Sequence, residues 1–112
     1  MGSTSDQLAE LAGEVFEFAD LIDYQTGSIV SRTLVDEEAA TLTVFALDDG
    51  QTISEHSAPH EATLQVLDGT GRVRIEDETY DLEAGEGIVF PANVPHAVEA
   101  PSRFKMLLTM IR

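Results

Sequence analysis

The chain has 112 residues, the size of one ordinary domain, and 43% of them are apolar, which is enough to build a core. It contains no cysteine, so disulfide bonds, thiolate metal ligands and cysteine nucleophiles are excluded. The formal net charge of -15 opposes binding to nucleic acid or to anionic membranes, because both need clustered positive charge on the protein.

The negative charge comes from 21 Asp and Glu residues against 6 Lys and Arg residues, and Lys105 is the only lysine. This excess favours either a surface adapted to high salt, where screening removes self-repulsion, or simply an acidic, soluble protein. No apolar run approaches membrane-spanning length, and the sequence does not start with a basic region followed by an apolar core. We therefore expect a cytoplasmic protein.

Residues 1–13 are expected to form a short N-terminal helix or an extended arm. Leu8, Leu11 and Ala12 have helical spacing, and Gly13 interrupts the pattern. Residues 14–112 are expected to form a single β-domain, because no linker, internal repeat or low-complexity run divides them.

From residue 28 onward the apolar pattern has a period of two, which predicts β-strands. The predicted strands cover residues 28–35, 41–47, 51–57, 63–67, 72–76, 79–82, 87–90, 96–99 and 104–111. A tight hairpin turn is predicted at residues 68–71, which read Asp-Gly-Thr-Gly. Many short strands joined by Gly, Pro and Asp turns indicate an all-β sandwich or barrel.

The last predicted strand, RFKMLLTMIR, is apolar on both of its faces. Such a strand lies either deep in a core or at a contact between subunits. In so small a barrel, this pattern predicts a homodimer.

All three histidines, His56, His60 and His96, lie in one stretch of the sequence that begins at Gly50. A compact barrel can bring them together, because inward residues of neighbouring strands converge. Strand alternation places residues 56, 58 and 60 on one face, although Pro59 can bend the chain there. If the three imidazoles meet, they form a metal site or a pocket for a small ligand.

The spacing of glycines around these histidines resembles a known pattern. Gly50 is followed after five residues by His56, and Gly69 closes the same stretch. These residues match the outer frame of the first motif of the cupin superfamily, small β-barrels of the jelly-roll class. The resemblance implies a cupin β-barrel over about residues 28–111.

The second cupin motif is matched by Gly85, Pro91 and His96 at the expected spacing. Asn93 stands in the position of the second glycine of that motif, where we expect it to shape the turn that presents the histidine. The resemblance implies a divalent transition metal, such as Mn, Fe, Ni or Zn, held by imidazole and carboxylate groups.

Three positions depart from the family pattern. Ala58 replaces the second histidine of the first motif, Ala62 its glutamate, and Ala100 the terminal asparagine of the second motif. Two of the four usual metal ligands are therefore methyl groups. Only His56 and His96 carry over position by position.

A third metal ligand would have to come from elsewhere in the chain. His60 is the first candidate, so His56, His60 and His96 are the predicted metal ligands. Glu61 lies one place before the glutamate position of the family and can enter through a bulge. Gln65 is a further oxygen donor, although simple alternation points it outward.

The alternative is a metal-free pocket in the mouth of the barrel, which holds a small ligand by shape and a few polar groups. Its predicted lining combines polar and apolar side chains: His56, His96, Gln65, Phe90, Phe104 and Met106.

Three functions stay open from the sequence. The first is a binding or sensing protein for a metal or a small organic molecule. The second is a metal-dependent enzyme, such as a dioxygenase, decarboxylase or isomerase, with Glu61 as a base. The third is a structural or interaction role for a dimer whose pocket is vestigial and binds no ligand.

Overall fold

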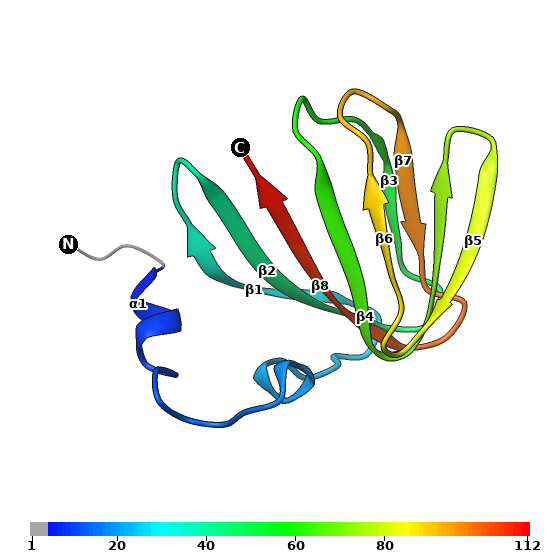
Figure 1. Ribbon diagram of the computed structural model, residues 1–112. Coiled ribbons are helices and arrows are strands. Elements are labelled where there is room, and N and C mark those ends of the chain that lie inside the picture. Colours follow the sequence, from blue (N-terminus) through cyan, green and yellow to red (C-terminus); the bar gives the residue numbers. More distant parts are fainter. Residues whose placement is uncertain (1–4) are drawn as a thin grey trace.

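The computed structural model of the protein describes residues 5–112, with side chains from Gln7 onward, and this part of the chain is built mainly of strands (Figure 1). The elements are α1 (Ser5–Ala9), η1 (Phe18–Leu21), β1 (Ile29–Asp36), β2 (Ala40–Leu47), β3 (Thr52–His56), β4 (Ala62–Ile75), β5 (Glu78–Glu83), β6 (Gly87–Phe90), β7 (His96–Glu99) and β8 (Phe104–Ile111). Neither of the two short helices in these residues is long and apolar enough to cross a membrane.

The strands form a curled antiparallel sheet, a half-barrel, with the order β1-β2-β8-β4-β7-β3 (Figure 1). The remaining two strands, β5 and β6, also pair with β4. The first half of β4 pairs with β8 and β6, and its second half pairs with β5 and β7. Strand β4 therefore belongs to both walls of the half-barrel, and the predicted all-β fold is confirmed.

The hairpin predicted at residues 68–71 is wrong, because the chain continues through it as the single strand β4. Its two glycines allow close packing there. A Cβ atom on Gly69 would collide with the carbonyl oxygen of Arg103, and one on Gly71 would lie 2.6 Å from Cε2 of Phe104. The glycines thus mark the crossing of β4 between the two walls, where the backbone of β8 and the Phe104 ring come very near.

The other seven predicted strands agree with the observed ones to within one residue at each end. The N-terminal helix is shorter than the apolar pattern suggested: α1 ends at Ala9, and a turn leads to Gly13, whose φ is +79°. Residues 1–4 of the predicted arm lie outside the described residues.

The segment that contains η1 packs on the outer face of the sheet. Ile22, which is buried, forms an apolar cluster there with Leu34 of β1, Val44 of β2 and Leu107 of β8. On the inner face, Phe104 and other side chains form the main core. The sheet is therefore covered on its outer side by the chain's own N-terminal segment.

This cover explains the two apolar faces of β8. Met106 points into the main core, whereas Leu107 is buried in the outer cluster by the N-terminal segment of the same chain. Only Ile111, at the end of the strand, is an exposed large apolar residue of β8. The pattern of β8 thus needs no second subunit, and the homodimer stays a prediction.

Candidate ligand-binding cavity

A cavity of about 250 Å³ lies between the walls of the half-barrel. The loop 57–61 between β3 and β4 and the loop 91–95 between β6 and β7 meet at one end, where the backbone N–H of Asn93 donates to the carbonyl oxygen of Ala58 at 2.7 Å. Asn93 has a φ of +65°, a conformation that asparagine tolerates better than most residues. Its expected role in shaping this turn agrees with that geometry.

The lining of the cavity is apolar apart from histidine. Its side chains are Phe45, Ile53, His56, Ala58, His60, Ala62, Leu64, Phe90, His96, Val98, Met106, Leu108 and Met110. No Asp, Glu, Lys or Arg is among them. Apart from the weakly accepting methionine sulfurs, the three histidines are the only groups in the lining that can form hydrogen bonds through a side chain.

Two of these histidines are direct neighbours, although 40 positions separate them in the sequence. His56 ends β3 and His96 begins β7, and the two residues are paired across these antiparallel strands. Their ring centroids lie 4.5 Å apart at an interplanar angle of 67°. The pairing of β3 with β7 therefore brings together the two residues that the cupin resemblance carried over.

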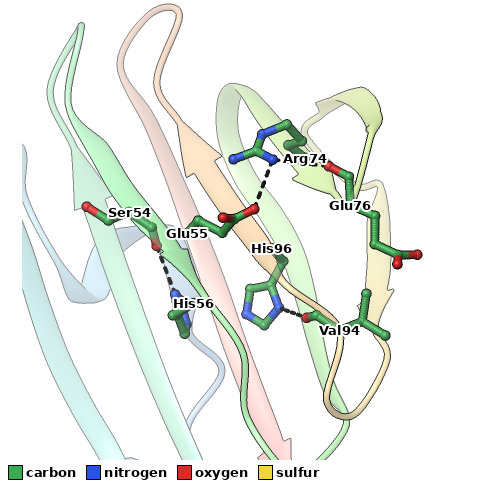
Figure 2. A network of polar contacts seen from close by, with 7 residues as sticks. All are labelled: Ser54, Glu55, His56, Arg74, Glu76, Val94 and His96. Carbon is green, nitrogen blue, oxygen red and sulfur yellow. Dashed lines mark hydrogen bonds and ion pairs between the residues drawn. The ribbon is translucent and has the colours of Figure 1, made fainter.

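Both rings are oriented by the backbone in the same way (Figure 2). Nδ1 of His56 lies 2.9 Å from the carbonyl oxygen of Ser54, and Nδ1 of His96 lies 3.1 Å from that of Val94. A carbonyl oxygen can only accept, so Nδ1 must carry the proton in each ring. In the neutral form of such a ring, Nε2 is then left with a free lone pair.

His96 is held in an apolar environment. Its ring stacks on Phe90 with a centroid distance of 4.1 Å and an interplanar angle of 4°, and only 6% of the residue is exposed. Burial lowers the pKa of His96 below its usual value of 6.5, and the nearby His56 lowers it further. His96 is thus neutral at pH 7, whereas His56 is exposed at the mouth of the cavity.

A charged pair lies beside the two histidines but outside the lining. Nη1 of Arg74 donates to the carboxylate of Glu55 at 3.0 Å, and both side chains are partly exposed (Figure 2). Neither Arg74 nor Glu55 lines the cavity, so the pair adds no charged group to the lining.

The structure separates the residues predicted to bind a ligand into two groups. Phe90 and Met106 line the cavity together with the histidines. Gln65 does not: it is exposed on the outer face of β4, as simple alternation indicated. Phe104 is fully buried in the core against Gly71 and is absent from the lining, so its inclusion was wrong.

Sequence reasoning missed several lining residues, of which Leu108 and Met110 are the clearest. Both lie two and four positions after Met106 in β8, on the same face of the strand. The period of two in this strand could have identified them once Met106 was assigned to the pocket. The contribution of β2 and β3, through Phe45 and Ile53, depends on pairing that the sequence does not reveal.

The donor set does not fit a resident metal centre. His60 lines the cavity too, yet residues 5–112 contain no group of three His, Asp or Glu side chains that could hold a metal ion. Glu61 is exposed and lines a groove on the outer surface, so it does not enter through a bulge as hypothesised. Ala58 and Ala62 present methyl groups where the family resemblance called for ligands.

Comparison with known proteins agrees with this geometry. A family model described as the cupin domain matches residues 43–112. A conserved protein of unknown function from Streptococcus pyogenes has a solved structure with 37% identity and a TM-score of 0.86, covering 89% of this chain and 88% of that chain. No curated protein matches this chain in sequence.

Two further solved structures carry the cupin name. A cupin 2 conserved barrel domain protein from Leptotrichia buccalis is 38% identical, with a TM-score of 0.84, over 87% of this chain and 47% of that chain. A cupin superfamily protein from Desulfitobacterium hafniense is 24% identical, with a TM-score of 0.85, over 88% of this chain and 91% of that chain, and shows the shared fold. Since the family model covers more than half of the sequence and the strands curl as in these structures, this chain belongs to the cupin family.

Proposed function

We propose that this cupin is a binding or sensing protein that holds a small organic molecule in the cavity, with His56 and His96 as its polar anchors. The observation that carries the proposal is the composition of the lining: ten apolar side chains and three histidines around about 250 Å³. Ligand pockets in proteins typically combine apolar walls with a few polar groups that fix orientation. Because the volume of this cavity is small for a ligand pocket, it fits only a small ligand.

A metal-dependent enzyme is less well supported. Two imidazoles alone hold a divalent metal weakly, and catalytic metal sites usually have three protein ligands. The carboxylate considered as a base, Glu61, is exposed in the outer groove. A dioxygenase, decarboxylase or isomerase of the kind the resemblance implied would need ligands or a base that the substrate itself brings.

The experiment is an NMR screen of uniformly ¹⁵N-labelled protein against small neutral aromatic and alicyclic compounds. We expect amide shifts to concentrate at residues around the cavity, such as Ala58, Phe90 and His96. The variant Ala58→Phe places a ring in the mouth of the cavity and should weaken binding at least about tenfold, which corresponds to roughly 1.4 kcal/mol.

Gln65→Phe is the matched control, because it adds the same side chain on the outer face of β4 and should leave binding unchanged. Addition of Mn²⁺, Fe²⁺, Ni²⁺ or Zn²⁺, followed by elemental analysis, tests whether the protein binds a metal instead. A stoichiometric metal that is lost in both His56→Ala and His96→Ala would contradict the metal-free proposal. Shifts that are equally strong in Ala58→Phe would contradict binding in this cavity.

A further inference from the structure

We infer that the cavity selects a neutral ligand that carries a hydroxyl or N–H hydrogen-bond donor on a small apolar body. This inference rests on the proposed function and names the chemical class of the guest. It follows from the two backbone contacts that orient His56 and His96, from the absence of charge in the lining and from the volume.

The backbone contacts of His56 and His96 fix the direction of hydrogen bonding in the cavity. The Nδ1–H of each ring is already used by a carbonyl oxygen, at Ser54 for His56 and at Val94 for His96. Within residues 5–112 the Nε2 atom of neither ring has a hydrogen-bond partner. The cavity therefore offers two acceptors and no side-chain donor from this pair, and a guest pairs with them only by donating.

The lining of the cavity disfavours a charged ligand. A carboxylate or phosphate in this cavity would meet the two Nε2 acceptors, the His60 ring and apolar walls, with no Lys or Arg in the lining. Burying an anion without a partner costs several kcal/mol, and the overall charge of -15 repels it further. An ammonium group could donate to these acceptors, but no Asp or Glu lines the cavity to compensate its charge. A neutral donor avoids both costs.

The apolar part of the ligand contacts the walls of the cavity. Apart from the histidines, the walls are hydrocarbon and thioether groups, including Phe45, Leu108 and Met110. Each methylene or ring carbon that leaves water for such a wall contributes favourably, whereas additional polar atoms would lose hydrogen bonds to water. About 250 Å³ accommodates a single ring with a short substituent rather than a drug-sized molecule.

The test uses four probes of one shape that differ in a single group: toluene, 4-methylphenol, 4-methylaniline and 4-methylbenzoate. Dissociation constants are measured by NMR titration of the full chain at pH 7.5. We expect 4-methylphenol and 4-methylaniline to bind at least about fivefold more tightly than toluene, the effect of one net hydrogen bond. The benzoate should bind more weakly than toluene.

The variant His56→Phe keeps a planar ring but removes the Nε2 acceptor. Because His56 is exposed at the end of β3, the fold should survive the change. We expect the ratio of the toluene and 4-methylphenol dissociation constants to fall toward one, while toluene itself still binds. His96→Phe tests the buried acceptor in the same way, and Gln65→Ala on the outer face should change neither value.

The outcomes separate this inference from the function on which it rests. If toluene binds in the cavity as tightly as 4-methylphenol, or if 4-methylbenzoate is the tightest probe, the inferred donor class is wrong while ligand binding in the cavity stands. An unchanged preference for 4-methylphenol in both histidine variants would also overturn the inference. If none of the four probes shifts the cavity residues at millimolar concentration, both the inference and the proposed function are contradicted.

Discussion

At the scale of single residues, Asp48 holds three segments of the chain together. It follows β2 directly, and its carboxylate accepts from the backbone N–H of Gly27 at 2.6 Å and from Nε of Arg103 at 2.7 Å. The Gly27 hydrogen bond is the main reason that the pKa of Asp48 is lowered to about 2, and Arg103 adds to the effect. This one carboxylate therefore connects the N-terminal segment and the start of β8 to the end of β2.

The lowered pKa predicts how stability depends on pH. A carboxyl group that ionises more readily when folded contributes stability above its unfolded pKa of about 4, and this contribution is lost as the pH falls toward 2. We expect Asp48→Asn to lower the urea midpoint clearly at pH 6 and much less at pH 2.5. The measurement is urea unfolding of both proteins at the two pH values.

Asp49→Asn is the matched control, because Asp49 is the exposed neighbour in the same turn. It removes the same formal charge and should shift the midpoint little at either pH. An Asp48→Asn effect that is equally large at pH 6 and pH 2.5 would contradict the link between this carboxylate and the acid side of the stability curve.

The sequence revealed the positions of the site histidines but not how their rings are held. The histidine positions were predictable from motif spacing, but their hydrogen-bonding direction was not. Carbonyl oxygens two residues earlier in the chain, at Ser54 and Val94, fix the protons, and only the backbone conformation brings them within reach. Phe104 was misassigned for a related reason: its large apolar ring suggested a pocket wall, whereas Gly71 leaves room for it in the core.

At the scale of elements, the course of β4 decides the architecture. The bonding of β4 changes from β8 and β6 to β7 and β5 near residue 69, with an irregularity in its pairing to β8 between Val66 and Asp68. Two glycines so close together in a strand usually suggest a turn, which is why a hairpin was predicted there. The sequence does not distinguish a glycine needed for a turn from one needed for a close approach.

Gly71 allows a direct test of this close approach. We expect Gly71→Ala to lower the free energy of unfolding by about 1–3 kcal/mol, because its methyl group would lie 2.6 Å from the Phe104 ring and force that ring to move. The measurement is chemical unfolding of the single variants and of the double variant.

The control is the background Phe104→Leu, in which the ring is absent. Gly71→Ala should cost clearly less there, which gives a coupling energy between the two positions. Additive effects of the two substitutions would mean that Gly71 is required for its backbone and not for the space it leaves to Phe104.

At the scale of the whole molecule, negative charge greatly exceeds positive charge. The 6 cationic side chains face 21 acidic ones. Four of these cations, all arginines, form ion pairs within residues 5–112, while Arg32 and Lys105 bond to neutral groups of the N-terminal segment. Most acidic side chains therefore have no cation within the chain to pair with, and they repel one another.

The excess of negative charge predicts that the melting temperature depends on salt, as the composition already indicated. Raising KCl from 0.05 M to 2 M shortens the Debye length to a few Å and removes most of the repulsion. We expect the melting temperature to rise by about 5 °C or more, which corresponds to roughly 1 kcal/mol for a domain of this size. Circular dichroism or differential scanning calorimetry measures it.

A variant with neutral residues in the exposed turn 76–77 and at the start of β5, Glu76→Gln, Asp77→Asn and Glu78→Gln, separates charge screening from general salt effects. It should melt higher than the natural sequence at low salt and gain less from KCl. A melting temperature that is flat from 0.05 M to 2 M KCl would remove the argument for adaptation to high salt.

The whole fold was largely predictable, because strand periodicity and two spaced motifs both indicated a cupin barrel. The homodimer prediction shows what such patterns do not reveal. Apolar residues on both faces of β8 report burial on both faces without indicating what covers them. Here the outer cover is Ile22 and its neighbours around η1, which a period of two cannot identify because that segment contains no strand.

The walls and the entrance of the cavity differ in construction, so different substitutions affect how tightly a ligand binds and how quickly it leaves. Its walls are paired strands, whereas the loops 57–61 and 91–95 meet at its entrance through the hydrogen bond from Asn93 to Ala58. Substitutions in the walls would act on equilibrium affinity. Substitutions in the loops but outside the lining, such as at Asn93, would act on residence time, so the speed of a response could change while its threshold concentration stays the same.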